Sequence, residues 1–152
     1  MTILQPLFLI FFGHFLAATL VYLNHRFVFH GKLGKIKFLK KIKRYHTRHH
    51  QKPNSTRHLL MPFWARAMFC VVYAAVGWFI SLWLMVGLAS FSLYYAIYHY
   101  RIHKAGVPRH RYLRRSYHHH NLHHTVPTVN FSGMHPFIDK IFASYTESRP
   151  IL

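Results

Sequence analysis

Acidic residues are almost missing from this sequence. Of its 152 residues, only Asp139 and Glu147 carry a carboxylate, against 20 lysines and arginines. A metal site built from several glutamates in a helix bundle is therefore excluded. The composition also differs from that of a soluble globular domain, whose surface normally mixes both charge signs.

Cysteine and strand patterns are equally scarce. Cys70 is the single cysteine and lies in an apolar run, so neither an intramolecular disulfide nor a cysteine-bound cluster is possible within one chain. No segment shows a convincing alternation of apolar and polar residues, and no repeat of about 20 to 50 residues recurs along the chain. We therefore expect an all-α protein, with one domain over residues 1–152.

Charged residues are absent from two long stretches, residues 1–24 and the segment between Arg66 and Arg101. The apolar run 3–23 would be about 31 Å long as a helix, which matches the ~30 Å hydrocarbon core of a bilayer. The apolar run 59–98 would be about 60 Å long, so two short spans with a turn near 77–81 fit better than one. A pair of helices lying partly in the membrane interface is the alternative.

The basic residues lie on either side of the second apolar run. Of the 20, 11 fall within residues 24–61 and 8 lie from His99 onward, which leaves only Arg66. Three spans place both basic segments on one side of the membrane, and the excess of positive charge predicts that this side is the cytoplasm, at a bacterial inner membrane or the endoplasmic reticulum. Nucleic acid is not an expected partner, because no nucleic-acid-binding fold remains once the spans are removed.

Histidine is the abundant residue here, with 16 in the chain. Ten of them fall into four groups along the sequence: His25 and His30; His46, His49 and His50; His99 and His103; His120, His123 and His124. Ten neutral imidazoles suit two transition-metal ions with about five ligands each. We expect the two polar segments that carry most of them to form helices over about 39–51 and 109–124, ahead of Pro53 and Pro127.

Helical spacing predicts how these imidazoles are directed. Residues three or four apart share a helix face, so His46 can act together with His49 or His50. Adjacent histidines diverge by about 100°, so each doublet can send one imidazole to each of two neighbouring metals. His25 and His30 are five apart and about 140° out of line, and they need a helix end, a bulge or different metals.

The remaining histidines have separate expectations. His14, His58, His110 and His135 are read as ordinary surface or core residues, although a histidine in the middle of a span, as His14 is, is a functional candidate. In the run 118–120, His120 repeats the position of His46, which leaves His119 as an outer partner of the metal ligands and directs His118 away.

Asp139 lies shortly after the last histidine group. It is a candidate for orienting a ligand imidazole through the ring nitrogen that does not face the metal. A helix cap or an ion pair with a nearby arginine is the alternative role for this carboxylate.

Four motifs resemble the histidine boxes of the fatty-acid hydroxylase and sterol desaturase superfamily: His25-Arg-Phe-Val-Phe-His30, His46-Thr-Arg-His49-His50, His99-Tyr-Arg-Ile-His103 and His120-Asn-Leu-His123-His124. The segment 51–57 and the spacing between the third and fourth boxes are similar to fatty-acid 2-hydroxylases. The segment from Asn130 to Phe142 is similar to the closing segment of the superfamily. The resemblance covers residues 24–145.

The resemblance implies a membrane-bound di-iron enzyme that uses dioxygen to oxidise a lipid, with a fatty acyl chain as the first choice of substrate. Its fold would be three short spans with a cytosolic helical cap that carries the histidine-rich di-metal site. Two iron ions would be bound, zinc could replace them because imidazole discriminates weakly, and an external ferredoxin or cytochrome with its reductase would supply electrons.

Two alternatives remain within the superfamily and one outside it. Carotenoid β-ring hydroxylases share Tyr112-Leu-x-Arg115 before the last box, although their third box is one residue longer, and sterol desaturases or oxidases carry the same boxes. A non-enzymatic membrane protein that binds or transports metal is the other class. Transporters usually place ionisable ligands within their spans, whereas these groups flank the spans, which favours an enzyme.

Overall fold

The computed structural model describes residues 3–147. The regular secondary structure of this part of the chain is entirely helical, with turns and loops between the helices. In chain order the elements are α1 (Leu4–Leu23), the π-helix η1 (Asn24–Phe29), the short 3-10 helix η2 (Leu33–Lys35), α2 (Lys40–Gln51), α3 (Thr56–Leu59), α4 (Phe63–Phe79), α5 (Leu82–Lys104), α6 (Arg111–Thr125) and α7 (Pro136–Ile141). The prediction of an all-α protein is confirmed.

Three segments are long and apolar enough to cross a membrane by length and composition: Leu4–Phe29, Thr56–Phe79 and Leu82–Lys104. The second and third are separated at Ile80 and Ser81, inside the predicted turn, and the Ser81 hydroxyl accepts a hydrogen bond from the backbone N–H of Leu84 at 3.4 Å. Large apolar side chains cover the outside of these helices; Trp78, for example, is 84% exposed. Such a surface is suited to contact with lipid.

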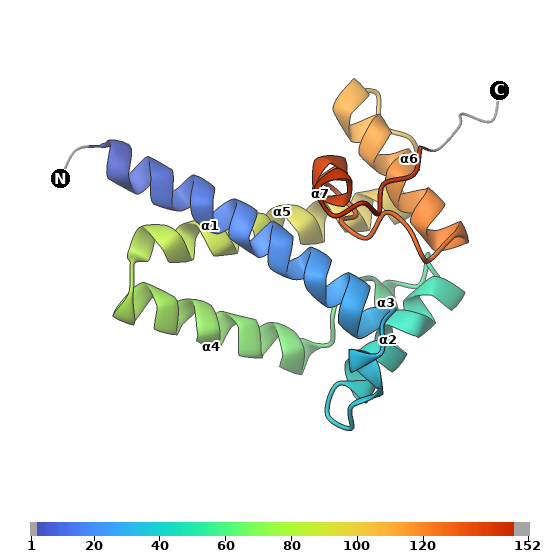
Figure 1. Cartoon of the computed structure of the whole chain (residues 1–152), viewed down its shortest axis with the longest axis horizontal. Coiled ribbons are helices and arrows are strands. Elements are labelled where there is room, and N and C mark those ends of the chain that lie inside the picture. The colour runs from blue at the N-terminus through green and yellow to red at the C-terminus, as the bar shows by residue number, and fades with distance from the viewer. Residues whose placement is uncertain (1–2, 148–152) are drawn as a thin grey trace.

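Helices α1 and α5 pack closely along their length (Figure 1). Gly13 and Gly87 face each other where the helices cross. A side chain on Gly13 would bring its Cβ within 2.6 Å of the Leu84 carbonyl oxygen, and one on Gly87 would meet the backbone of Ile10. Small residues at such a crossing let two membrane helices approach. The crossing fixes α5, which carries His99 and His103, against α1, which leads into the segment with His25 and His30.

The shorter helices α2, α3 and α6, with α7 beside α6, gather toward the end of the long helices that lies away from the N-terminus (Figure 1). Their bounds follow local sequence signals. Helix α2 ends shortly before Pro53, and α5 ends before Gly106, which has a φ of 73°. Helix α7 starts with Pro136 in its first turn, where a missing N–H costs nothing. The observed bounds of α2 and α6 lie within two residues of the predicted ones.

Candidate metal centre

The ten histidines picked out by the sequence converge into two groups of five. Within each group the ligand nitrogen atoms all lie within 4.8 Å of one another. Group A consists of His25, His30, His46, His50 and His123; group B consists of His49, His99, His103, His120 and His124. Histidines from η1 and the residue after it, from α2, from α5 and from α6 therefore meet at one place.

The two histidine doublets divide between the groups. On α2, His49 belongs to group B and His50 to group A; on α6, His123 belongs to group A and His124 to group B. The 100° rotation between adjacent helical residues separates the members of each doublet. Residues four apart, such as His46 and His50, share a helix face and stay in the same group. Helices α2 and α6 thus each serve both groups.

His25 and His30 reach the same group because the chain between them is a π-helix. The backbone N–H of His30 donates to the carbonyl of His25 at 3.1 Å, the hydrogen bond between residues five apart that defines this helix. This wider turn brings residues at that spacing onto one face. The sequence had left three arrangements open for this pair: a helix end, a bulge or different metals. The structure shows the second, since the π-helix is a local widening of the helix.

The imidazole nitrogens are crowded in a way that hydrogen bonding alone does not explain. The Nε2 atom of His46 lies 3.1 Å from Nε2 of His25 and 3.0 Å from Nε2 of His30, and it also lies 3.0 Å from Nε2 of His50. A neutral imidazole has a single N–H, so one nitrogen cannot bond to three others in this way. Metal–nitrogen bonds of about 2.1 Å at right angles place neighbouring nitrogens about 3.0 Å apart. The donor atoms of the groups therefore fit bound metal ions.

Burial keeps these imidazoles neutral. It lowers the pKa of His49 to about 2, with nearby His99 and His103 adding to the effect. Burial likewise lowers the pKa of His30 to about 3 and that of His123 to about 4. A neutral imidazole offers a lone pair, which a metal ion requires. At pH 7 these groups are ready to bind a metal without first losing a proton.

Two imidazoles of group A donate hydrogen bonds to backbone carbonyls. His25 donates through Nδ1 to the carbonyl of Phe131, and His123 donates through Nδ1 to the carbonyl of Val129 at 2.7 Å. These bonds fix the tautomer, so that Nε2 carries the lone pair in both residues. The two carbonyls lie in the segment between α6 and α7. The sequence-based predictions concerned only side chains and therefore did not include these contacts. The similarity of 130–142 to the closing segment of the superfamily was the available signal.

Group B is held differently. The Nδ1 atoms of His120 and His124 are buried and have no hydrogen-bond partner in the described part of the chain. The ring of His99 instead stacks on Tyr95, with centroids 5.4 Å apart and planes inclined by 10°. Packing rather than hydrogen bonding sets the orientation of these rings.

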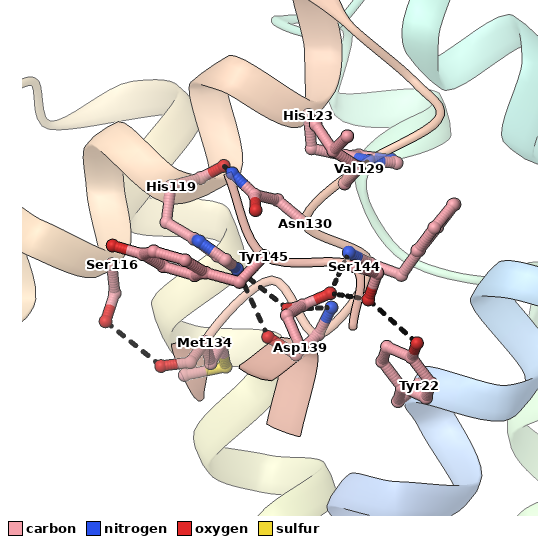
Figure 2. Close-up of polar contacts among 12 residues, drawn as sticks. Tyr22, Ser116, His119, His123, Val129, Asn130, Met134, Asp139, Ser144 and Tyr145 are labelled. Atoms are coloured by element: carbon pink, nitrogen blue, oxygen red, sulfur yellow. Dashed lines mark hydrogen bonds and ion pairs between the residues drawn. The ribbon is translucent and has the colours of Figure 1, made fainter. Parts of the chain in front are cut away.

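His119 and Asp139 bond to each other (Figure 2). His119 Nε2 donates to Asp139 Oδ2 at 2.9 Å, and Asp139 is completely buried. Burial by itself would raise the pKa of Asp139, but hydrogen bonds from His119, Ser132 and Ser144 outweigh it and lower the pKa. The carboxylate is therefore charged, and no hydrogen bond joins it directly to a described histidine of group A or B.

The other histidines lie outside both groups. His118 packs against the ring of Tyr117, with centroids 5.4 Å apart. His14 lies 3.1 Å from the Ser90 hydroxyl, and His135 Nδ1 lies 2.9 Å from the Tyr112 hydroxyl. A cavity of about 430 Å³ reaches group A: His30 lines it together with residues that include Arg26 and Lys32.

The protein thus combines three helical segments that could cross a membrane, by length and composition, with two groups of five imidazoles, each of which could hold a metal ion. Residues 10–144 match the family model described as fatty acid hydroxylase. The chain belongs to this family and is an oxidoreductase that acts on lipids. It is 32% identical over 134 residues to a beta-carotene hydroxylase from Paracoccus sp. (strain N81106 / MBIC 01143), covering 79% of this chain and 78% of that protein. No solved structure matches the chain.

Proposed function

We propose that this protein is a dioxygen-dependent lipid hydroxylase in which groups A and B each hold one iron ion, and that a fatty acyl chain is its substrate. The observation that supports the proposal most directly is the convergence of five imidazole nitrogens in each group, within 4.8 Å of one another. Imidazole ligands suit iron, and zinc would also bind because imidazole discriminates weakly among these metals.

The reaction consumes the lipid C–H bond, one dioxygen, two electrons and two protons, and it yields the alcohol and one water. Groups A and B would hold the iron ions, and with iron bound the site would activate dioxygen, the oxidant, which no side chain can do. The chain contributes the placement of the metals. The Phe131 and Val129 carbonyls orient His25 and His123, and burial keeps the imidazoles neutral.

The electrons come from outside the chain in this proposal, from an acidic carrier of the ferredoxin or cytochrome type with its reductase. Basic residues surround the histidine groups in sequence, and Arg26 and Lys32 line the cavity that reaches His30. Complementary charge would speed the encounter of such a surface with an acidic partner.

A carotenoid ring hydroxylase is the second candidate, because the Paracoccus relative is described as a beta-carotene hydroxylase and aligns over most of both chains. The deciding experiment expresses the protein in cells that make β-carotene and compares lipid extracts by mass spectrometry, with the His46→Ala variant as control. A gain of one oxygen atom in fatty acids supports the first candidate, and a gain in the carotenoid supports the second. Loss of two hydrogens would point to desaturation, and unchanged extracts would contradict a hydroxylase.

Metal analysis of the purified protein tests the cofactor. We expect close to two metal ions per chain, with iron required for activity. A stoichiometry near one, or full activity with zinc alone, would contradict the di-iron proposal.

We also propose that the cap faces the cytoplasm, since 19 of the 20 basic residues lie in the two histidine-rich segments. A single thiol at Lys35→Cys, in a Cys70→Ser background, should react with an impermeant reagent only from the cytoplasmic side. Labelling from the outer face alone would reverse the orientation.

A further inference from the structure

Asp139 stands apart as a carboxylate buried in a strongly basic protein. Its side chain is completely buried, whereas Glu147 is exposed at the surface. Burying a charge is costly unless it is paired and hydrogen-bonded. The contacts that compensate this cost show what the carboxylate holds in place.

Both oxygen atoms of Asp139 are fully used. Oδ1 accepts from the backbone N–H of Phe131 at 2.7 Å and from the Ser144 hydroxyl at 2.8 Å. Oδ2 accepts from the backbone N–H of Ser132 at 3.0 Å and from His119 Nε2 at 2.9 Å. The Ser144 hydroxyl also lies 2.8 Å from the hydroxyl of Tyr22 on α1, which ties this network to the first long helix (Figure 2).

One of these contacts leads directly to group A. The N–H of Ser132 and the carbonyl of Phe131 belong to the same peptide group. The N–H donates to Asp139 Oδ2, while the carbonyl accepts the hydrogen bond from His25 Nδ1. Hydrogen bonds in such a chain polarise one another, so a negative charge at the N–H end makes the carbonyl a stronger acceptor at the other end.

We propose that Asp139 is a positioning residue for the metal ion of group A and that it acts on His25 through the peptide group between Phe131 and Ser132. This inference rests on the proposed function, since it requires a metal in each group. Carboxylates that bond directly to a metal-binding histidine fix its tautomer and raise its basicity. Here one peptide group lies between the carboxylate and the imidazole, and the effect is directed to one of the two metals.

Neighbouring contacts make the arrangement rigid. The Asn130 side chain donates to the Thr146 carbonyl at 3.0 Å and accepts from the Thr146 N–H at 2.8 Å. The backbone N–H of Asn130 donates to the Ser144 carbonyl at 2.9 Å. These hydrogen bonds fix the backbone next to the Phe131 carbonyl, and Asp139 places a negative charge beside the same segment.

The test compares three proteins in detergent: wild type, Asp139→Asn and Glu147→Gln. The first variant keeps the size of the side chain but removes its charge. The second makes the same change of carboxylate to amide at the exposed Glu147, outside the four contacts of Asp139, and is the matched control. Each is titrated with Co²⁺ against a chelator, which gives the affinity of both metals separately, and helicity is measured by circular dichroism.

We expect Asp139→Asn to weaken one of the two metals about 10- to 100-fold, the usual effect of losing an outer partner of a ligand. The other metal and the helicity should remain unchanged, and Glu147→Gln should bind both metals as wild type does. In a His25→Ala background, Asp139→Asn should cause no further loss of metal affinity, because the two residues act through one path.

Three results would overturn the inference. Equal weakening of both metals in Asp139→Asn would show a merely structural role. Undiminished binding of both metals in this variant would show that the peptide path carries no effect, and a further loss in the His25→Ala background would show another path. A wild-type stoichiometry near one would instead overturn the two-metal proposal, and this inference with it.

Discussion

Groups A and B contain the same number of imidazoles but are supported by different parts of the chain. In group A, His25 and His123 donate to backbone carbonyls of the segment between α6 and α7. In group B, the Nδ1 atoms of His120 and His124 are buried without a partner in the described residues, and His99 is stacked on Tyr95. Backbone hydrogen bonds thus hold two rings of group A, whereas stacking on Tyr95 holds the His99 ring of group B.

Because the two groups are supported differently, their metals should respond differently to substitutions near the ligands. A hydrogen bond fixes a tautomer and raises the basicity of the imidazole, so group A depends on remote polar residues such as Asp139. A packed ring depends on the volume around it and is insensitive to charge at a distance. Group A is also reached by the cavity beside His30. We therefore expect the two metals to differ in lability.

Removing a central ligand from either group should have the largest effect. His46→Ala removes the nitrogen around which group A is arranged, and His120→Ala does the same for group B. We expect each variant to lose about one metal per chain and to have no detectable hydroxylation, because both metals are needed for the reaction. His118→Ala, which changes a histidine outside both groups, is the control. Retained activity in His120→Ala with loss in His118→Ala would mean that the 118–120 run is in another register.

His119→Ala should have an intermediate effect, confined to group A. His119 contacts Asp139 rather than a member of either group, so its loss leaves Asp139 with three of its four hydrogen bonds. We expect activity to fall by no more than about 10- to 100-fold. Metal titration should show weaker binding at one site only. Weakening at group B would contradict the division of support between the two groups.

Lowering the pH should test whether the imidazoles of groups A and B are equally shielded from water. Burial lowers the pKa of His30 to about 3 and of His123 to about 4 in group A, and the pKa of His49 to about 2 in group B. Because these folded-state pKa values lie below the unfolded value of about 6.5, their contribution to stability is present above pH 6.5 and is lost as the pH falls through the folded values of about 4 to 2. Metal should be retained after dialysis at pH 5.5. Loss of one metal near pH 6.5 would show that water reaches the imidazoles of group A through the cavity beside His30.

The smallest effect is expected from the crossing of α1 and α5: α1 leads directly into η1, which carries His25 of group A, and α5 carries His99 of group B. Gly87→Val would force the helices apart, and overpacking of this kind typically costs about 1 to 3 kcal/mol. We expect a lower thermal stability in detergent with both metals retained. Ala89→Val, at an exposed position of the same helix, is the control. Loss of one metal alone in Gly87→Val would show that the crossing also sets the distance between the groups.

Much of the fold was predictable because its determinants are local. The absence of charge over residues 1–24 and between Arg66 and Arg101 predicted the spans, and Pro53 and Pro127 predicted where α2 and α6 end. The ten histidines were also identified from their spacing, and the structure brings all ten together. Their role as metal ligands stays a prediction.

The sequence by itself determined the lengths of the spans, the helix ends and the separation of the members of each histidine doublet, because bilayer thickness and helix periodicity act over a few neighbouring residues. Only the tertiary structure decided that η1 is a π-helix, which histidines share a group, and that the Phe131–Ser132 peptide lies between Asp139 and His25. His25 and Phe131 are 106 residues apart. A contact of this kind depends on how distant helices pack, which no local pattern records.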